Sequence, residues 1–487
     1  MDVLPRPAAL FDREAEWMEL ARFTSDASVG ATLAVLYGRR RQGKTLMLEL
    51  LAEATGGFMF TGLEQSSTQN LAALGRAYAA FRGLGAPVAF ADWEQALEAL
   101  LALGEDGRPL PVILDELPYL IRTAPEIPSL VQRALSPRGR ARTHSRTRLV
   151  LCGSAFAVMG RLLSGTAALR GRASCEIVIH PFGFRESASF WGVDSDLDLA
   201  FRLHALVGGT PAYRDFCLGD LPATSADLDP WVVRHLLNPS SAFFREGRTL
   251  IAEEPEISEL SLYFSVLAAI ASGSRRRTQI ALALGRKESA LSHPLTLLEE
   301  MRLIQRRRDP LRPTRTIYHI CEPMLRFHQL VIAPNEARLV RRDGQRVWAG
   351  CADTVSSLIY GPHFEELARE WTMLHATPAT LGGTPRLVGS TEIDCPSHRR
   401  RHEIDVLVTD GDRALALGEA KWRPQAVGPS ELERLRHLRD LLGPRRSPSG
   451  TRLLLFSRSG FTPELISEAR GSAEVQLVDL ERLYTGD

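Results

Sequence analysis

The chain has only three lysines, Lys44, Lys287 and Lys421, although lysine and arginine together number 59 of its 487 residues. Two of the three lie in motifs where an ammonium group has a chemical advantage. Lys44 belongs to Gly-Arg-Arg-Arg-Gln-Gly-Lys-Thr at 38–45, and Lys421 belongs to Glu-Ala-Lys at 419–421. A compact ammonium can be desolvated against a phosphate or a metal-bound water, where a flat guanidinium is a poor substitute. The lysines therefore predict phosphate chemistry at two places in the chain.

The first lysine motif has the surroundings of a phosphate-binding loop. An apolar run at 31–37, typical of a buried strand, ends at Gly38, and a helical pattern begins after Gly43. Strand, glycine loop, Gly-Lys-Thr and helix form the context in which such a motif binds a nucleotide. Backbone N–H groups would hold the phosphates, Lys44 would reach the β- and γ-phosphate oxygens, and Thr45 would bind Mg²⁺. The motif therefore predicts ATP and Mg²⁺ as cofactors.

Two later strands would complete this site. The apolar run 111–114 leads directly into Asp115 and Glu116. Asp115 would lie beside the Mg²⁺, and Glu116 would polarise the attacking water. The next strand-like run, 148–153, ends at Ser154, whose hydroxyl would sense the γ-phosphate. A plain turn at a strand end is the other interpretation of this serine.

Acidic residues accompany Lys421 in the last part of the chain. Two strand-like segments, 403–408 and 414–422, carry Asp405 and Glu419, which can converge at adjacent strand ends. Paired carboxylates bind a hard cation such as Mg²⁺ through their oxygens. Lys421 follows Glu419 by two residues and shares its strand face, where it can contact a metal-activated water or a scissile phosphate. The set predicts metal-dependent cleavage of a phosphodiester.

A helical pattern at 361–370 offers one more acid to the same centre. Glu365 can reach it from the helix, and Glu366 competes for the same role. A degenerate domain that binds nucleic acid without cutting it is the alternative for this part of the chain.

The middle of the chain is strongly basic. Between Arg275 and Arg346, 15 arginines and Lys287 stand against seven acids. A local net charge of about +9 favours an anionic partner, with nucleic acid as the first candidate. A solvated surface in an arginine-rich protein is the other interpretation.

The same region has the element pattern of a winged helix-turn-helix. Helical patterns at 260–271, 278–285 and 289–301 precede strand-like segments at 303–310 and 315–320. In a version that reads DNA, the third helix and the hairpin would contact nucleic acid. The candidate residues are Lys287, Ser289, Arg306, Arg307 and Arg308. A lid or a protein contact is the alternative role for such a module.

Several motifs together resemble the archaeal-type P-loop ATPases, which are related to the AAA+ and STAND ATPases. They are Phe-Asp-Arg-Glu at 11–14, the loop at 38–45, Leu-Asp-Glu-Leu-Pro-Tyr-Leu at 114–120 and Leu-Cys-Gly-Ser at 151–154. The usual C-terminal partner in that family is a restriction-endonuclease-like domain. The acids and lysine described above resemble the motif of the PD-(D/E)XK nuclease superfamily.

The resemblance implies two further nucleotide contacts. Arg172, in Leu-Arg-Gly-Arg at 169–172, stands where such proteins carry an arginine that faces nucleotide, and Pro211 stands where a proline packs near the adenine. If Arg172 acts in trans on a neighbour's nucleotide, the protein must form a homo-oligomer. A surface arginine is the alternative.

We therefore expect an α/β multi-domain fold. It comprises a P-loop ATPase sandwich at 1–200, a helical lid at 201–255, a winged helix at 256–322, a linker at 323–350 and a PD-(D/E)XK restriction-endonuclease-like α/β domain at 351–487. A chain of 487 residues is long for a single core, so several domains are expected on length alone.

Composition favours a cytoplasmic protein with no membrane partner. The six cysteines are scattered without a Cys-x-x-Cys pair, which argues against a zinc module or a disulfide scaffold and favours a reducing compartment. The N-terminus lacks the apolar core of a signal peptide. No apolar run approaches the roughly 20 residues needed to span a bilayer.

The sequence thus predicts a protein that binds and hydrolyses ATP and controls a Mg²⁺-dependent nuclease-like domain acting on nucleic acid, DNA in the first place. A role in defence against foreign DNA would suit this layout by analogy of fold. The alternatives are a nucleotide-switched DNA-binding regulator and a STAND-like signalling ATPase, each with an inactive nuclease fold.

Overall fold

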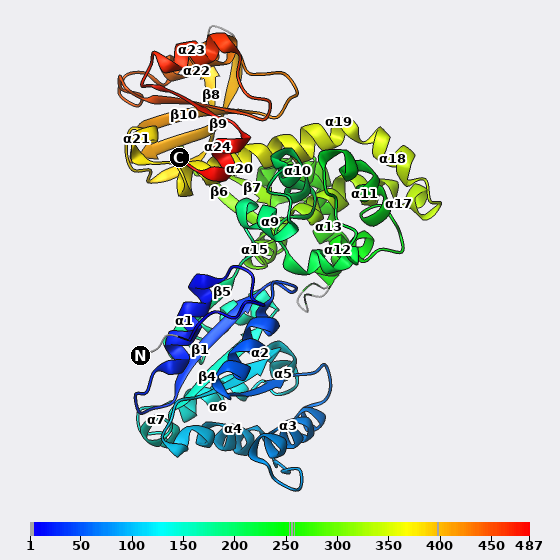
Figure 1. Cartoon of the computed structure of the whole chain (residues 1–487), viewed down its shortest axis with the longest axis vertical. Coiled ribbons are helices and arrows are strands. Elements are labelled where there is room, and N and C mark those ends of the chain that lie inside the picture. The colour runs from blue at the N-terminus through cyan, green and yellow to red at the C-terminus, as the bar shows by residue number, and fades with distance from the viewer. Residues whose placement is uncertain (1–3, 253, 255–256, 258, 397–398) are drawn as a thin grey trace. The chain divides into compact units, whose positions relative to one another are not determined.

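The computed structural model describes residues 4–252, 254, 257, 259–396 and 399–487. The chain divides into two units, Met1–Pro181 with Thr210–Ala212 and Phe182–Gly209 with Tyr213–Asp487 (Figure 1). Each unit is built around its own five-stranded sheet. None of the helices in the described ranges is long and apolar enough to cross a membrane.

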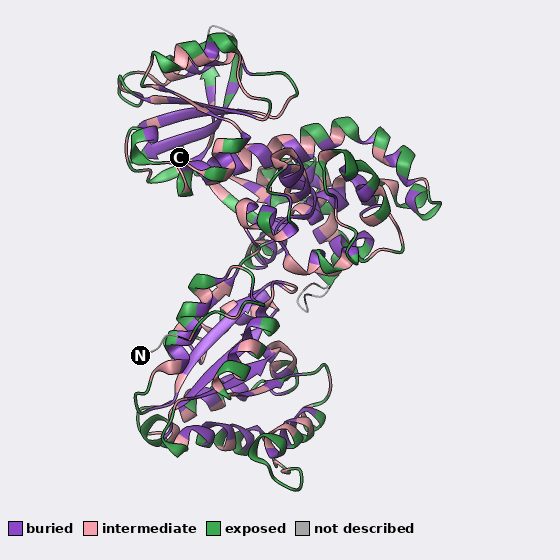
Figure 2. Cartoon of the chain, in the orientation of Figure 1, coloured by how far each residue is buried: buried purple, intermediate pink, exposed green. Residues whose placement is uncertain are grey.

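The sheet of the first unit is parallel, with the strand order β2-β3-β4-β1-β5. Its strands are β1 (Thr32–Gly38), β2 (Phe58–Thr61), β3 (Leu110–Asp115), β4 (Thr147–Gly153) and β5 (Ala173–Ile179). β3 and β4 are buried along their whole length, and Figure 2 shows the buried strands at the centre of this unit. Because the strands are parallel, the carboxyl ends of β1, β3 and β4 meet at one edge of the sheet, where α/β proteins bind ligands.

Helices cover both faces of this sheet. Leu33 and Val35 of β1 lie in one core with residues of α3, α4 and α6, whereas Ala34 and Leu36 lie in the other with residues of α1 and α2. Alternate side chains of a strand point to opposite faces, so an apolar strand of this kind needs cover on both sides. The helices are α1 (Glu14–Ser25), α2 (Lys44–Thr55), α3 (Ser67–Arg82), α4 (Trp93–Ala102), α5 (Leu117–Thr123), α6 (Ile127–Ala134), α7 (Arg140–His144) and α8 (Phe156–Leu162).

The second unit joins a large helical part to a second sheet through one continuous core. Its first helices are α9 (Phe184–Trp191), α10 (Leu197–Val207), α11 (Leu228–His235) and α12 (Ala242–Ala252). Further along the chain come α16 (Pro323–Phe327), α17 (Ala333–Val340), α18 (Gly344–Gly350), α19 (Ala352–Thr354) and α20 (Gly361–Leu374).

This core corrects two predicted domain boundaries. Of the segment predicted as a lid, residues 201–209 and 213–252 belong with the second unit. The segment at 323–350 is helical where the sequence was expected to give a linker. Met324, Phe327 and Leu339 are fully buried in the core. Arginines separate these apolar residues in the sequence, so the segment looks polar. Its apolar side chains nevertheless form part of the core.

Between these helical segments lie three helices and a hairpin: α13 (Leu260–Ala271), α14 (Arg277–Leu284), α15 (Ser292–Glu300), β6 (Ile304–Asp309) and β7 (Arg312–Ile320). The third helix begins at Ser292, three residues later than predicted, after a 3₁₀ turn at Glu288–Leu291. This start places Pro294 in the first helical turn, where its missing N–H breaks no helical hydrogen bond. Ser289 therefore lies in the turn before the helix.

The second sheet has the order β12-β11-β10-β9-β8. Its strands are β8 (Leu387–Cys395), β9 (Arg400–Asp410), β10 (Arg413–Lys421), β11 (Arg452–Ser457) and β12 (Val475–Val478). The pairs β8–β9 and β9–β10 are antiparallel, and the other two are parallel. Helix α20 contributes to the core on one face and α22 (Pro429–Leu442) to the core on the other. Short helices α21 (Pro378–Leu381), α23 (Pro463–Arg470) and α24 (Leu480–Thr485) complete this part.

Candidate functional site

The lysine loop of the first unit joins the end of β1 to the start of α2. β1 ends at Gly38 and α2 begins at Lys44. A Cβ on Gly38 would lie 2.4 Å from the carbonyl oxygen of Ile179 on β5, so only glycine fits where the chain leaves the sheet. Gly43 has φ 84, a backbone conformation that glycine adopts without strain. Both glycines therefore shape the loop that sets Lys44 at the helix N-terminus.

The Lys44 ammonium is held inside this loop. Its Nζ donates to the carbonyl oxygens of Gly38 at 2.9 Å and Arg39 at 2.7 Å, and the residue is only 5% exposed. Burial lowers the pKa of Lys44 below its ordinary value. A desolvated ammonium hydrogen-bonded to neutral carbonyl oxygens has a strong electrostatic preference for an anion such as a phosphate.

Thr45 and Asp115 converge at the same edge of the sheet. The Thr45 hydroxyl donates to Asp115 Oδ2 at 2.9 Å, and Asp115, at the end of β3, is 1% exposed. Mg²⁺ requires oxygen ligands, and a hydroxyl beside a buried carboxylate supplies them. The two residues therefore fit a Mg²⁺ ion next to the lysine loop.

Ser154 contacts the Glu116 carboxylate. The Ser154 hydroxyl lies 2.9 Å from Glu116 Oε2 and 3.0 Å from Oε1, and donates to the carboxylate. Arg40 Nε lies 3.4 Å from the same hydroxyl. The Ser154 hydroxyl is thus hydrogen-bonded to Glu116, and its predicted contact with the γ-phosphate stays a prediction. The contact fixes the orientation of the Glu116 carboxylate, and Arg40, which the sequence prediction did not include, lies beside both residues.

A distant segment of the chain reaches the loop. Gln42 Nε2 donates to the Thr210 hydroxyl at 3.1 Å, and the Ala212 N–H lies 3.5 Å from the Arg41 carbonyl oxygen. Pro211 stands between these two contacts, so it lies beside the phosphate loop. Its predicted contact with the adenine stays a prediction.

Arg172 lies at the opposite edge of the sheet. β1 and β5 are parallel, with Leu33 opposite Ala173 and Gly38 opposite Ile179. Arg172 directly precedes β5, so it lies roughly 20 Å along the strands from the lysine loop at about 3.3 Å per residue. An arginine side chain cannot bridge that distance. Arg172 therefore does not reach the lysine loop of its own subunit, and action in trans and a plain surface position both stay open.

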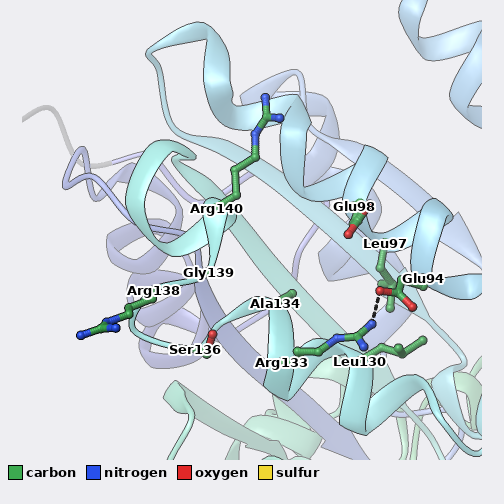
Figure 3. A pocket seen from close by; sticks show the side chains of 10 residues that line it. All are labelled: Glu94, Leu97, Glu98, Leu130, Arg133, Ala134, Ser136, Arg138, Gly139 and Arg140. Carbon is green, nitrogen blue, oxygen red and sulfur yellow. Dashed lines mark ion pairs between the residues drawn. The ribbon is translucent and has the colours of Figure 1, made fainter.

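A separate surface hollow of about 290 Å³ lies among α4, α6 and the residues before α7. Figure 3 shows that charged side chains line it and that the Arg133 guanidinium pairs with the Glu94 carboxylate. None of the lysine-loop residues described above lines this hollow. It therefore adds nothing to the nucleotide site.

In the second unit, three carboxylates gather between α20 and β9. One oxygen from each of Glu365, Glu403 and Asp405 lies within 4.8 Å of the others. Carboxylates crowd together in this way at sites for hard cations such as Mg²⁺ or Mn²⁺. The sequence prediction included Glu365 and Asp405 and missed Glu403. Its spacing of two residues from Asp405 on the same strand was the available signal.

A β-bulge places Asp405. β9 runs three residues from Ile404 to Leu407 while β8 runs two from Thr391 to Gly389, so β9 carries one extra residue there. Bulges redirect side chains and are frequent beside active sites. Asp405 Oδ2 also accepts the Ala420 N–H at 2.9 Å, and the Asp405 carbonyl oxygen accepts from Arg369 at 2.8 Å. Two hydrogen bonds, one to its side chain and one to its main chain, thus hold Asp405 in place.

Glu419 and Lys421 form a second group next to Asp405. Glu419, 2% exposed, accepts from Arg434 Nη1 at 2.7 Å and from the Lys421 ammonium. Burial, and then the charge of Asp405, raise the pKa of Glu419. Both cations contact Oε1, whereas Oε2 is buried with no hydrogen-bond partner among the described residues. The predicted metal pair of Asp405 with Glu419 therefore stays a prediction, and the acids that cluster most closely with Asp405 are Glu365 and Glu403.

Glu366 is committed to ion pairs. Its carboxylate accepts from Arg307, with one N–O distance of 2.6 Å, and from Arg369 at 3.1 Å. Although burial opposes ionisation, these two arginines hold the pKa of Glu366 well below its ordinary value. Glu365 is therefore the helix acid of the cluster. Arg307 is engaged by a carboxylate of its own chain, and its predicted contact with a phosphate stays a prediction.

Other arginines of the basic segment are paired in the same way. Arg276 and Arg315 both bind Glu392 of β8, at 2.8 and 2.6 Å. Arg312 lies 3.5 Å from Asp394 on the same strand. Carboxylates of the second unit thus balance part of the positive charge of this segment, and that part needs no external anion. The remaining predicted contacts are exposed and stay predictions: Lys287, Ser289, Arg306 and Arg308.

Removing the charge of Glu365 should stabilise the metal-free protein. Burial, and then Asp405, raise its pKa from 4.5 to about 7. A carboxyl group whose pKa is raised on folding stabilises the folded chain fully below pH 4.5. This stabilisation is lost as the pH rises through 7. Glu365→Gln should therefore unfold at higher denaturant concentration than the wild type at pH 8, by roughly 1–3 kcal/mol. The difference should shrink towards pH 5.

Denaturant titrations of the chelated full chain at both pH values measure this difference. Glu433→Gln, an exposed change on α22, is the control and should follow the wild type at both pH values. Equal stability of Glu365→Gln and the wild type at pH 8 would contradict the assignment of Glu365 to a strained acidic cluster.

Comparison with known proteins places the fold among the ATPases. The sequence matches no protein-family model. It is 26% identical over 305 residues to the uncharacterised protein MJECL04 of Methanocaldococcus jannaschii, a match that covers 62% of this chain and 64% of the relative. The chain thus spans less than two thirds of that relative's length.

Among solved structures, the chain resembles the Walker-type ATPase PABY2304 of Pyrococcus abyssi, with a TM-score of 0.51 and 20% identity over 66% of this chain and 97% of that one. The ORC2 protein of Aeropyrum pernix also matches, with a TM-score of 0.42 and 15% identity over 72% of this chain and 98% of that one. With its parallel sheet and lysine loop, the chain is therefore an α/β multi-domain protein with the fold of a Walker-type, P-loop ATPase.

Proposed function

We propose that the protein binds and hydrolyses ATP. The observation that carries this proposal is the contact of Thr45 with Asp115 beside the buried Lys44 ammonium. These are the three groups that a P-loop ATPase uses to hold Mg²⁺ and the β- and γ-phosphates.

The chain's own residues have distinct tasks in this reaction. Lys44 binds phosphate oxygens and offsets the charge that develops on them. Glu116 accepts a proton from the attacking water, and Ser154 holds its carboxylate in place for that transfer. Thr45 and Asp115 would hold Mg²⁺, which supplies charge neutralisation at the phosphates. In an oligomer, Arg172 of one subunit would act at the nucleotide of the next.

We further propose that the last part of the chain is a PD-(D/E)XK-like, Mg²⁺-dependent nuclease whose action ATP controls. Glu365, Glu403 and Asp405 offer oxygen ligands to the cation. Lys421, beside Glu419, would contact the scissile phosphate or the attacking water. We take α13–α15 with β6–β7 as a winged helix that presents DNA to this site.

The test is a cleavage assay on single- and double-stranded DNA and RNA with Mg²⁺ or Mn²⁺, with and without ATP. The expected result is cleavage of DNA that requires the cation and changes with ATP, together with ATP hydrolysis by the same preparation. Absence of ATP hydrolysis would overturn the first proposal, and ATP hydrolysis without cleavage of any substrate would overturn the second.

One observation favours a second candidate, a nucleotide-switched DNA-binding regulator. Lys421 and Arg434 both bind Glu419 Oε1, so cationic side chains of the chain itself occupy this oxygen, as in a nuclease fold that no longer binds a metal ion through it. The regulator would bind DNA, with an affinity that depends on the bound nucleotide, and would not cut it. Binding and cleavage measured on the same DNA separate the two candidates.

A further inference from the structure

Cys395, His402 and His437 meet on the face of the second sheet that α22 covers. Cys395 ends β8, His402 lies near the start of β9, and His437 belongs to α22. Ile393 of β8 pairs with His402, and Cys395 shares the face of Ile393 because alternate residues of a strand point the same way. Strand pairing and the overlying helix therefore assemble the three side chains.

The donor atoms have the spacing of a metal site. Cys395 Sγ lies 3.4 Å from His437 Nε2, and one donor atom from each residue lies within 4.8 Å of the others. Tetrahedral zinc, with bonds of about 2.3 Å to sulfur and 2.0–2.1 Å to nitrogen, separates such donors by roughly 3.3–3.6 Å. A small side-chain rotation would bring all three to one ion.

The burial and the chemistry of the three donor atoms also favour zinc. Cys395 is 2% and His402 5% exposed, whereas His437 is half-buried. Three protein ligands with a partly open side leave the fourth position to water. One thiolate with two imidazoles suits a borderline-soft cation, in contrast to the oxygen-only acids at Glu365, Glu403 and Asp405.

We propose that Cys395, His402 and His437 bind Zn²⁺, at a site separate from the acidic cluster. The ion would clamp the β8–β9 connection to α22. It would also fix the start of β9, the strand that carries Glu403 and Asp405 only a few residues after His402. Loss of zinc would therefore loosen the acidic cluster without removing any of its ligands.

Cobalt reports on this site directly. The full chain, stripped of metal by a chelator, is titrated with Co²⁺ and then with Zn²⁺. We expect one Co²⁺ per chain, with a near-ultraviolet thiolate-to-cobalt absorption and visible bands of tetrahedral intensity, and displacement by Zn²⁺. Cys395→Ser should lose the thiolate band and weaken Zn²⁺ binding by more than the roughly 10–100-fold typical of outer-shell changes.

Matched variants make the result specific. Cys351→Ser removes another buried cysteine of the same unit and should bind Co²⁺ as the wild type does. Asp405→Asn should keep the cobalt spectrum, because it alters only the acidic cluster. His437→Gln removes a half-buried ligand and tests the site again if Cys395→Ser fails to fold.

Two outcomes would overturn the proposal. Octahedral cobalt without a thiolate band would mean that the three side chains form only a thiol–imidazole hydrogen bond. Equal Zn²⁺ affinity of the wild type and of Cys395→Ser or His437→Gln would place zinc elsewhere. Neither outcome bears on ATP hydrolysis or on DNA cleavage with Mg²⁺.

Discussion

Replacing Lys44 with alanine is expected to lower ATP hydrolysis by roughly 100-fold or more, the loss that follows removal of one preorganised charge-stabilising group. The physical reason is the position of the ammonium, buried in the loop and hydrogen-bonded to the carbonyl oxygens of Gly38 and Arg39. Without it, the phosphate charge that develops in the reaction has no fixed counter-charge at this place. Steady-state phosphate release and binding of a fluorescent ATP analogue measure the effect.

The loss should not arise from unfolding. Burial lowers the pKa of Lys44, so keeping this charge buried lowers the free energy of unfolding. Removal of the charge should restore that free energy. Lys44→Ala should therefore unfold at the same denaturant concentration as the wild type or a higher one. Lys287→Ala, which removes an exposed lysine before α15, is the matched control and should hydrolyse ATP at the wild-type rate. Full hydrolysis by Lys44→Ala would refute the phosphate-loop assignment.

The candidate residues of the nucleotide site could be picked out from the sequence because each belongs to a local motif. Asp115 ends β3, and the loop after β1 leads to Lys44 and Thr45 at the start of α2. Parallel strands bring their carboxyl ends to one edge of the sheet. Whether Arg172 acts within one subunit or in trans was left open by the sequence, because the strand that begins at Ala173 was not identified. The pairing of β5 with β1 places the start of β5 at the end of the sheet opposite the lysine loop.

The acidic cluster was predicted only in part because tertiary structure decides it. The bulge between Ile404 and Leu407 leaves no pattern in the sequence. Glu366 and Glu419 each bind one arginine that is distant in sequence, Arg307 at 59 residues and Arg434 at 15 residues. Sequence alone could not tell which acids these cations would neutralise.

Tertiary structure also decides which charges of the basic segment are balanced. The net charge of this segment suggested an external anion, yet Arg276, Arg307 and Arg315 bind carboxylates of the same unit. The zinc candidate was hidden for a related reason. Cys395 and His437 are 42 residues apart and meet only when α22 covers the sheet, so a search for closely spaced cysteine pairs could not find them.

Replacing Asp405 with asparagine is expected to abolish cation-dependent DNA cleavage and to leave ATP hydrolysis unchanged. Asp405 is the acid whose carboxylate lies with both Glu365 and Glu403, so its charge is central to cation binding. A bound metal ion contributes several kcal/mol to the transition state, and about 1.4 kcal/mol is tenfold in rate. Cleavage should therefore fall by roughly 1000-fold, measured as the initial rate on labelled DNA.

Asparagine suits this test because it keeps the shape of the site. Its amide oxygen can still accept the Ala420 N–H that Asp405 Oδ2 accepts now, so the bulge need not rearrange. Asp410→Asn, an exposed change at the end of the same strand, is the matched control and should cut like the wild type. Wild-type cleavage by Asp405→Asn would remove the acidic cluster from the reaction. Tight DNA binding by both proteins with no cleavage by either would instead make the protein a regulator that uses a nuclease fold to bind DNA.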